Sequence, residues 1–440
     1  MSILNLMPLF IVFSAIVMLF CLRFFLVLHP LNTLKMAFKA LLFSKAKSTL
    51  ALALAGTLGV GNIIGVAVGI GIGGAGCVFW IAFSALFSSV LKFSESALSR
   101  DTDRLGGGML SVIVKTFKAF GKAISRIYAI LCLGLALVMG GALQASSASE
   151  CIGKVFGGAQ YHFFLGAFVF LVLIAISNGG RFIERIMSFV IPISVLAYVA
   201  LSIAVIVLNH QRIPDAVSSI FTSAFSVRSA GGGVFSFLSI TTIREGFFRG
   251  LLSNEAGAGT SSLAHSDNDR DSVVTAGLLG ICEVVFDTLI LCTLTGLAVL
   301  VGAPDYSSYN SGIEIILNAF GRSLGNVSVI VLTVIISAFA FSTVVCWFYY
   351  GLKCFAFLFG TGYQAIYKSV YIVAVIFGLL GNVNFFIEVS DYLLFALCLI
   401  STVTVMKNSD RLRNLSEKEG LIPNRRQFPR RLPWTPRRYN

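Results

Sequence analysis

The strongest constraint on this sequence is the recurrence of apolar runs long enough to cross a lipid bilayer as helices. A spanning helix needs about 20 predominantly apolar residues. Eleven such runs occur, the seventh weaker than the rest, at residues 8–28, 48–70, 77–98, 127–149, 162–178, 186–208, 243–263, 273–302, 327–352, 366–382 and 389–406. Because 57% of the residues are hydrophobic and only 12% are charged, the sequence predicts an all-α polytopic membrane protein with about 11 transmembrane helices.

The basic residues gather in alternate connections between these runs. The connections after the first and third runs and the tail 407–440 are rich in Lys and Arg. The connections after the fifth, seventh and ninth runs hold Arg181, Arg185, Arg270, Lys353 and Lys368, whereas the other connections hold only Lys154, Arg212, Arg228 and Arg322. The positive-inside rule therefore places the N-terminus outside a cell membrane and the tail in the cytoplasm. The net charge of +13 reflects this topology, and nucleic-acid binding is set aside.

The tail 407–440 is polar, basic and interrupted by Pro, so it is expected to be disordered. Two roles stay open for it: a solvated segment that fixes topology, or a segment that lies on anionic lipid. The nine cysteines include no CxxC pair, and the sequence predicts neither a disulfide framework nor a bound metal or cofactor. It does not indicate an oligomeric state.

Two of the apolar runs are interrupted by glycine and polar residues. The second contains "AGTLGVGNIIGVAVGIGIGGAG", residues 55–76, and the seventh contains "NEAGAG", residues 254–259. A dinucleotide fingerprint fails in the second run because Ile64 occupies the position of the last glycine. The spacing of Gly61, Gly65 and Gly69 favours close helix packing, but it does not account for the polar residues around them.

Polar side chains and glycines weaken a helix at membrane depth, where unsatisfied backbone is tolerated only beside a cavity enclosed by protein. A broken helix offers free carbonyls to a cation and free amides to a carboxylate. Two interrupted spans at matching positions of two halves are typical of secondary transporters. The sequence therefore predicts two broken helices that face a substrate.

At these residues the chain resembles the alanine/glycine:cation symporters, also called the sodium:alanine symporter family. "AGTLGVGNIIGVA" resembles the family's AGTVGTGNIAGVA, and "RGLLSNEAGAGTSSLAHS" resembles RGLFSNEAGLGSAPIAHA. "LKFSESALS", "VFDTLILCTLTGL" and "AFSTVVCWFYYGLKCFAFLFG" follow further family motifs in the same order. The resemblance implies a single leucine-transporter-type domain over 1–406, with inverted five-helix repeats at 48–208 and 242–406 and a peripheral helix at 8–28.

The resemblance also implies roles for particular residues. Substrate contacts, or for the second broken helix support of the unwound backbone, are implied for Thr57, Gly59, Gly61, Asn62, Gln144, Asn254, Gly257, Gly259 and Trp347. Sodium would meet the hydroxyls of Ser342 and Thr343. The first broken helix, in the second apolar run, would supply carbonyls near Ala55 and Leu58. The alternative for the two hydroxyls is a bond to a carbonyl of their own helix.

Four carboxylates lie within predicted spans, where such groups are costly and usually paired or functional. Glu95 can pair with Lys92 three residues earlier. Glu255 either supports the unwound backbone or contacts a ligand. Glu283 and Asp287 share a helix face and form either a proton site or partners for Arg244 or Arg249.

The sequence also departs from the family pattern. Val60 replaces a family threonine, Ala75 replaces a proline, and Glu283 stands where the family is small or apolar. These departures leave the exact substrate and the coupling ion open.

The function implied by the resemblance is sodium-coupled symport of a small neutral amino acid, alanine or glycine, into the cell by alternating access. A proton-coupled symporter and, less favoured, a channel remain as alternatives. An enzyme is not indicated, because no nucleophile and base stand at a recognisable spacing.

Overall fold

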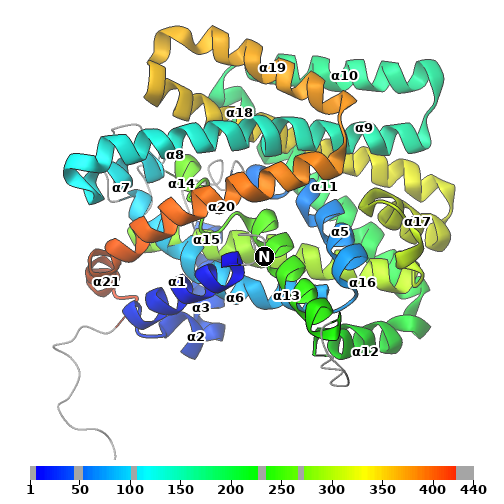
Figure 1. Ribbon diagram of the computed structural model, residues 1–440, viewed down its shortest axis with the longest axis horizontal. Helices are drawn as coiled ribbons and strands as arrows, with labels where there is room; N and C mark the ends of the chain where they lie inside the picture. The colour runs from blue at the N-terminus through cyan, green and yellow to red at the C-terminus, as the bar shows by residue number, and fades with distance from the viewer. Residues whose placement is uncertain (1–5, 44–52, 101–106, 226–233, 266–271, 423–440) are drawn as a thin grey trace, which may run out of the picture.

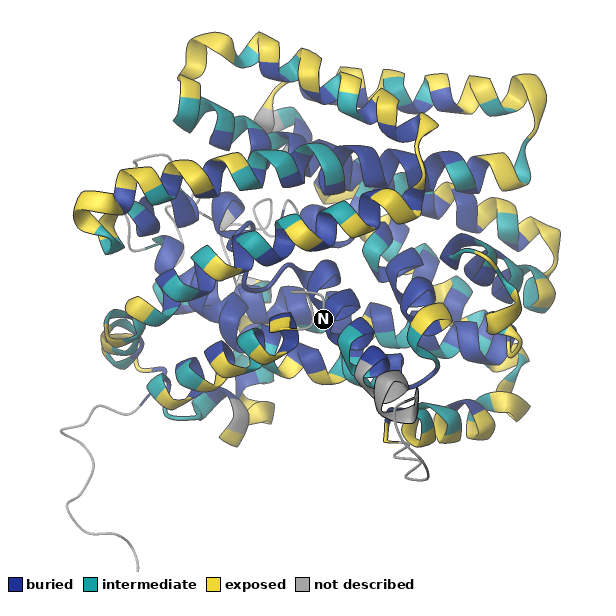
Figure 2. Ribbon diagram, in the orientation of Figure 1, coloured by how far each residue is buried: buried dark blue, intermediate teal, exposed yellow. Residues whose placement is uncertain are grey.

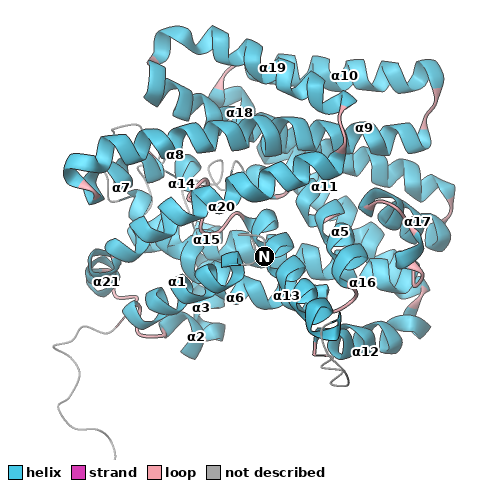
Figure 3. Ribbon diagram, viewed as in Figure 1, coloured by secondary structure: helices cyan, strands magenta, loops and turns pink. Residues whose placement is uncertain are grey.

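The computed structural model describes residues 6–43, 53–100, 107–225, 234–265 and 272–422. Within these ranges every regular segment is helical (Figure 3), which confirms the predicted all-α class. Eight helical segments of the described residues are long and apolar enough to cross a membrane: Cys77–Arg100, Lys118–Val155, Gly158–Ser177, Arg185–Leu208, Val273–Gly302, Asn326–Phe359, Thr361–Leu380 and Val383–Lys407. Two further apolar helical segments, Met7–Cys21 and Val60–Gly73, are shorter. The count of 11 spans stays a prediction.

The helices follow one another along the chain with short connections (Figure 1). In order they are α1 (Met7–Cys21), α2 (Phe25–Leu28), α3 (Pro30–Phe43), η2 (Val60–Asn62), α5 (Ile64–Gly73), α6 (Cys77–Arg100), α7 (Gly108–Thr116), η3 (Lys118–Phe120), α8 (Gly121–Leu135), η4 (Ala136–Leu143), α9 (Gln144–Val155), α10 (Gly158–Ser177), α11 (Gly180–Leu208), η5 (His210–Arg212), α12 (Ile213–Ala224), α13 (Val234–Asn254), α14 (Ser262–His265), α15 (Val273–Val284), η6 (Val285–Cys292), α16 (Thr293–Gly302), η7 (Tyr306–Ser308), α17 (Gly312–Leu324), α18 (Asn326–Phe359), η8 (Thr361–Tyr363), α19 (Gln364–Leu380), α20 (Val383–Lys407) and α21 (Ser409–Lys418).

Burial separates an inner set of helices from an outer set. In the most apolar 18-residue stretch of α10, α11 and α19, only 28% of the residues are buried within the protein, against 61% in α6 and α18. Figure 2 shows the exposed residues along α10 and α19 at one edge and the buried ones in the middle. The outer helices expose large apolar side chains such as Phe163, Phe170 and Phe377, as expected of surfaces that face lipid.

The first predicted span, 8–28, is not one continuous helix. α1 ends at Cys21 and α2 begins at Phe25, and between them Arg23 and Phe24 have positive φ angles of 54° and 55°. α1 contacts α6 and α20. The buried side chain of Ile11 on α1 lies next to Gly257, because a Cβ atom added to Gly257 would be 3.0 Å from Ile11 Cδ1. α1 therefore packs close to the second predicted broken helix.

The prediction of a disordered tail from residue 407 is wrong for its first part. α21 folds back on the protein: Arg23 Nη2 lies 2.7 Å from Glu417 Oε1, and Glu419 accepts hydrogen bonds from the first amides of α15. Leu412 and Ile422 are buried. The apolar side chains of this segment pack against the protein although the segment is polar and basic on average. Residues 423–440 lie outside the described residues.

Close packing of α13 on α6 places the second predicted broken helix in the centre. Gly246 and Gly250 are four residues apart and face α6, where a Cβ on Gly246 would lie 2.3 Å from Trp80 Cβ and 3.0 Å from Cys77 O. A Cβ on Gly250 would lie 2.1 Å from Ser84 Oγ. These two glycines therefore allow the backbones of α6 and α13 to approach.

We expect Gly246→Ala to destabilise the fold by about 1–3 kcal/mol, because the added methyl group overpacks the α6–α13 contact. Thermal unfolding of the purified protein in detergent measures the loss. Gly166→Ala on α10 is the matched control, since a Cβ there meets no atom within 4 Å. Equal melting temperatures for the two variants would contradict the packing role of Gly246.

Candidate functional site

The helix of the second predicted span is broken in its middle. Residues 53–57 are helical, Leu58 and Gly59 are not, and α5 begins at Ile64 after the short turn η2. Gln144, at the start of α9, accepts a hydrogen bond from the amide of Val60 through its Oε1 at 3.1 Å. A side chain from another span therefore satisfies an amide that the break sets free. The predicted first broken helix is confirmed.

The second broken helix is unwound between α13 and α14. Glu255, Gly257 and Gly259 have positive φ angles of 55°, 87° and 76°. Glycine tolerates this backbone conformation, whereas it is costly for glutamate. The surrounding contacts must therefore hold Glu255 in place.

Three side chains from other helices bond to the unwound segment. Lys92 Nζ donates to Asn254 O at 2.6 Å, and Tyr128 Oη donates to Ala258 O at 2.8 Å. Trp347 Nε1 donates to Glu255 Oε1 at 3.2 Å. All these residues are buried, so the protein replaces water as the partner of the exposed backbone.

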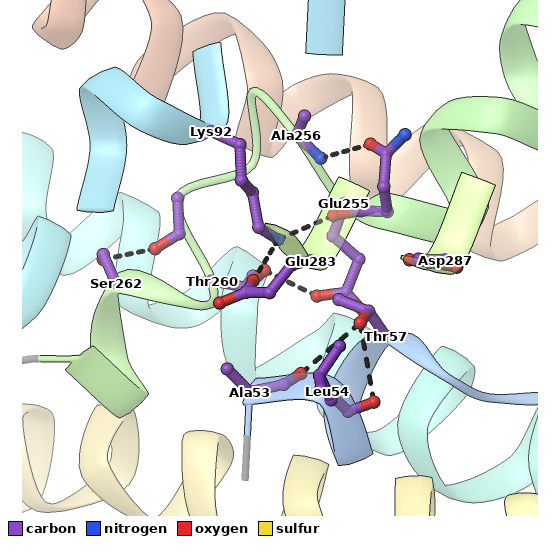
Figure 4. Close-up of polar contacts among 12 residues, drawn as sticks. Ala53, Leu54, Thr57, Lys92, Glu255, Ala256, Thr260, Ser262, Glu283 and Asp287 are labelled. Atoms are coloured by element: carbon purple, nitrogen blue, oxygen red, sulfur yellow. Dashed lines mark hydrogen bonds and ion pairs between the residues drawn. The ribbon is translucent and has the colours of Figure 1, made fainter. Parts of the chain in front are cut away.

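Both carboxylate oxygens of Glu255 accept hydrogen bonds from buried side chains. Its Oε1 accepts from Trp347, and its Oε2 accepts from Thr260 Oγ1 at 2.6 Å. Trp347 itself packs on η4, where a Cβ on Gly140 would lie 2.2 Å from Trp347 Cβ. These contacts tie the Glu255 carboxylate to a tryptophan of another helix and to Thr260 within the unwound segment (Figure 4). Support of the backbone and contact with a ligand both stay open as the role of Glu255.

The ninth predicted span, α18, meets the first broken helix at one hydroxyl. Thr343 Oγ1 lies 3.0 Å from Ala55 O and donates to it. Ser342 Oγ instead donates to Phe339 O of its own helix at 2.8 Å. The structure brings Thr343 to the predicted cation position, while the hydroxyl of Ser342 is turned to its own helix.

A small pocket lies where the break meets α18 and η4. It is lined by Gly56, Thr57, Gly59, Gly61, Met139, Leu143, Gln144, Leu252, Glu255 and Thr343. The structure thus gathers four of the predicted substrate residues, while Asn62, Asn254, Gly257, Gly259 and Trp347 are not among the lining. The hydroxyl of Thr57 faces its own helix, 3.4 Å from Ala53 O.

The intramembrane carboxylates have partners that differ from those proposed from sequence. Glu283 pairs with Lys92, whose Nζ lies 3.3 Å from Glu283 Oε2, with both side chains fully buried (Figure 4). Glu95 accepts instead from Ser401 Oγ at 3.0 Å. The suggested Lys92–Glu95 pair is therefore wrong, and so is the alternative in which Arg244 or Arg249 pairs with Glu283, because packing of α15 on α6 brings Glu283 to Lys92.

Arg244 and Arg249 belong to a separate charged cluster. Arg249 Nη2 lies 3.0 Å from Glu245 Oε2 and 3.3 Å from Asp391 Oδ2, and Arg244 Nη2 lies 2.8 Å from Glu245 Oε1. These four residues line an open cavity of about 580 Å³, which we call the charged vestibule. Leu252 lies three residues beyond Arg249 on α13 and lines the pocket at Gly59, so the helix connects the vestibule with the broken segment.

Sequence reasoning did not assign site roles to Lys92, Tyr128, Ser253 or Asp391. Lys92 carried a usable signal, because a lysine in the middle of an apolar span needs a partner. Its contact with Asn254 joins residues 162 positions apart, and no periodicity in the sequence indicates such a pair.

Comparison with known proteins identifies the family of this chain. The model of the sodium:alanine symporter family matches residues 2–415. A relative named as an uncharacterized transporter, YflA of Bacillus subtilis, is 30% identical and aligns over 82% of this chain and 78% of its own length. The sodium/alanine symporter AgcS of Methanococcus maripaludis is 28% identical over 78% of this chain and 76% of its own length.

A solved structure shows the same fold. The crystal structure of MhsT in complex with L-phenylalanine aligns with 85% of this chain and with 89% of the MhsT chain. The TM-score is 0.59 and the sequence identity is 13%. This likeness confirms the expected leucine-transporter-type fold. Family and fold are those of transporters rather than enzymes, and the chain belongs to the sodium:alanine symporter family.

Proposed function

We propose that this transporter couples the entry of sodium to the uptake of a small neutral amino acid, alanine or glycine, by alternating access. The contact between Thr343 Oγ1 and Ala55 O at 3.0 Å is the observation that supports the sodium site best. A hard cation takes oxygen ligands, and a hydroxyl and a carbonyl from two different spans meet here. A cation bound at this point would hold α18 against the first broken helix.

The substrate proposal rests on the small space around Gly59. A Cβ on Gly59 would lie 2.8 Å from Thr343 Oγ1 and 3.0 Å from Gln144 Oε1, and a Cβ on Gly61 would lie 3.6 Å from Leu252 O. The N-terminus of α5, which begins at Ile64, favours a carboxylate nearby. A small α-amino acid fits these features, because its carboxylate can approach the backbone while little room remains for a side chain.

Proton coupling through Glu283 and Asp287 is the second candidate. The ion pair with Lys92 argues against Glu283 as a freely exchanging proton carrier, because removal of either partner's charge leaves the other buried and unpaired. Asp287 is not in such a pair among the described residues. Sodium is therefore proposed first, and protons remain the alternative at Asp287.

Purified protein in liposomes tests the coupling ion. We expect an inward sodium gradient to drive accumulation of labelled alanine, and we expect choline in place of sodium to abolish it at constant pH on both sides. Empty liposomes give the background. Equal uptake in choline and in sodium, together with uptake driven by an imposed proton gradient, would reject sodium coupling and favour proton coupling.

Thr343→Val and Ser342→Ala separate the two hydroxyls of α18. Thr343→Val keeps the side-chain shape and removes the oxygen next to Ala55 O, so the sodium concentration for half-maximal alanine uptake should rise several-fold. Ser342→Ala is the matched control, since its hydroxyl bonds within its own helix. The same shift in both variants, or in neither, would contradict the proposed site.

Gly59→Ala tests the substrate pocket. We expect it to abolish alanine uptake, because the new methyl group would displace the side chains of Thr343 and Gln144. Surface expression and the melting temperature are measured in parallel. Normal uptake by Gly59→Ala would show that the substrate binds elsewhere.

A further inference from the structure

The helix α21, which follows the last predicted span, is fastened to elements far from it in the sequence. Cys21 Sγ at the end of α1 donates a hydrogen bond to Ser409 O at 2.8 Å. Asn408 Nδ2, between α20 and α21, donates to Thr116 Oγ1 of α7 at 2.7 Å. Leu412 in the middle of α21 is fully buried. The helix is therefore held by α1 and α7 as well as by α20, from which it continues.

Two carboxylates fasten the other end of α21. Glu417 Oε1 lies 2.7 Å from Arg23 Nη2, just beyond α1. Glu419 Oε1 and Oε2 accept hydrogen bonds from the amides of Val273 at 3.2 Å and Val274 at 2.8 Å. These are the first amides of α15, which no carbonyl of that helix can reach, and negative charge is favoured at a helix N-terminus. The end of α21 thus binds both α1 and α15.

A turn after α21 brings further apolar side chains onto the protein. Gly420 has a φ angle of 76°, and the amide of Leu421 donates to Ser416 O at 2.9 Å. Leu421 and Ile422 are buried. Together with the buried residue of α21 itself, they fix the position of the helix on the protein, while the ion pair to α1 stays partly exposed.

α21 connects two groups of helices. α20 packs on α8 and η4, which also contact α18, and α18 supplies Thr343 to the first break. α15 packs on α6, and α6 packs on α13, which leads into the second break. Because α21 continues α20 and caps α15, it spans both groups at one end of the protein.

The charged vestibule lies toward the opposite end. Ile315 of α17 lines it, and Figure 1 shows α17 and α21 at opposite edges of the protein, with α7 on the α21 side. On that side the second broken helix is covered: the amide of Met109 on α7 donates to Ser262 Oγ at 2.8 Å, and Lys353 Nζ donates to Leu263 O at 2.6 Å. The structure is thus open at the vestibule and closed on the α21 side.

We propose that α21 is a latch that holds this side of the transporter closed and has to leave α1 and α15 before the side opens. The positive-inside pattern predicts that the side faces the cytoplasm, so release of α21 would precede discharge of substrate into the cell. Partly exposed ion pairs are individually weak, so the helix can detach and return in each cycle. The proposal rests on the alternating access of the proposed function and adds a control of its rate by the chain's own end.

Hydrogen–deuterium exchange of the purified full-length protein, without sodium or alanine, tests the latch independently of transport. In the double variant Glu417→Gln with Glu419→Gln, we expect amide exchange in α7 and α14 to rise at least two-fold, because loss of both carboxylates favours the released state. Asp410→Asn is the matched control and should equal the wild type, since its ion pair with Arg413 lies within α21. Glu417→Gln alone should give a smaller rise and replaces the double variant if that one does not fold.

Alanine uptake into liposomes gives the functional readout. Conformational steps limit the turnover of many proteins, so the initial rate of sodium-driven uptake should rise several-fold in the double variant. Ser409→Cys should have the opposite effect. All nine cysteines lie in the described ranges, and Cys21 is the one that is not buried. Oxidation with copper phenanthroline should join it to the new cysteine and stop uptake until a reductant restores it.

The outcomes separate a latch from a static cap. Unchanged exchange in α7 and α14 of the double variant would overturn the latch. A lower melting temperature of that variant with slower uptake would identify α21 as a static cap and overturn it too, as would full uptake by the cross-linked protein. A wild type that accumulates no alanine, while exchange rises in the double variant as expected, would overturn the proposed function and leave the latch in place.

Discussion

The structure depends on one constraint: in the hydrocarbon core of a bilayer, every backbone amide and carbonyl needs a partner supplied by the protein. Continuous helices satisfy this requirement internally, but the two broken helices do not. At the first break, Gln144 and Thr343 bond to the amide of Val60 and the carbonyl of Ala55. At the second, Lys92 and Tyr128 bond to carbonyls of Asn254 and Ala258. The packing of the surrounding helices is what brings these side chains to the breaks.

The same requirement explains how local ligand contacts can influence distant helices. A side chain that satisfies a broken helix belongs to a different span, so a change in that bond changes the contact between the two spans. α18 shows this most clearly, since Thr343 contacts the first broken helix and Trp347 holds Glu255 in the second. A substrate or cation that replaces one of these bonds acts on both broken helices through α18. Binding can then be linked to helix movement, because a ligand shifts the balance between two conformations only when its contacts with them differ.

The sequence allowed prediction of the features that are local in the chain. Glycine and polar residues at 55–62 and 254–259 marked both breaks, because such residues weaken a helix wherever they lie. The contact of Thr343 with the Ala55 carbonyl followed from family resemblance and from the chemistry of sodium. The contacts of Lys92 and Tyr128 with the second break were not predictable. Lys92 and Glu283 are 191 positions apart in the printed sequence, and only the packing of α15 on α6 brings them together. Ser342 and Thr343 differ in their hydrogen-bond partners, because the hydroxyl of Ser342 bonds within its own helix and that of Thr343 bonds to Ala55 O. Composition does not reveal such a difference in rotamer.

The central claim is that the first broken helix is completed by sodium, whereas the second is held mainly by side chains of the chain itself. Hydrogen–deuterium exchange of the purified protein in sodium and in choline tests this claim most directly. The account predicts that sodium slows amide exchange in peptides covering residues 55–63 strongly, with a smaller effect on residues 255–261. Equal exchange of residues 55–63 in the two salts would contradict it.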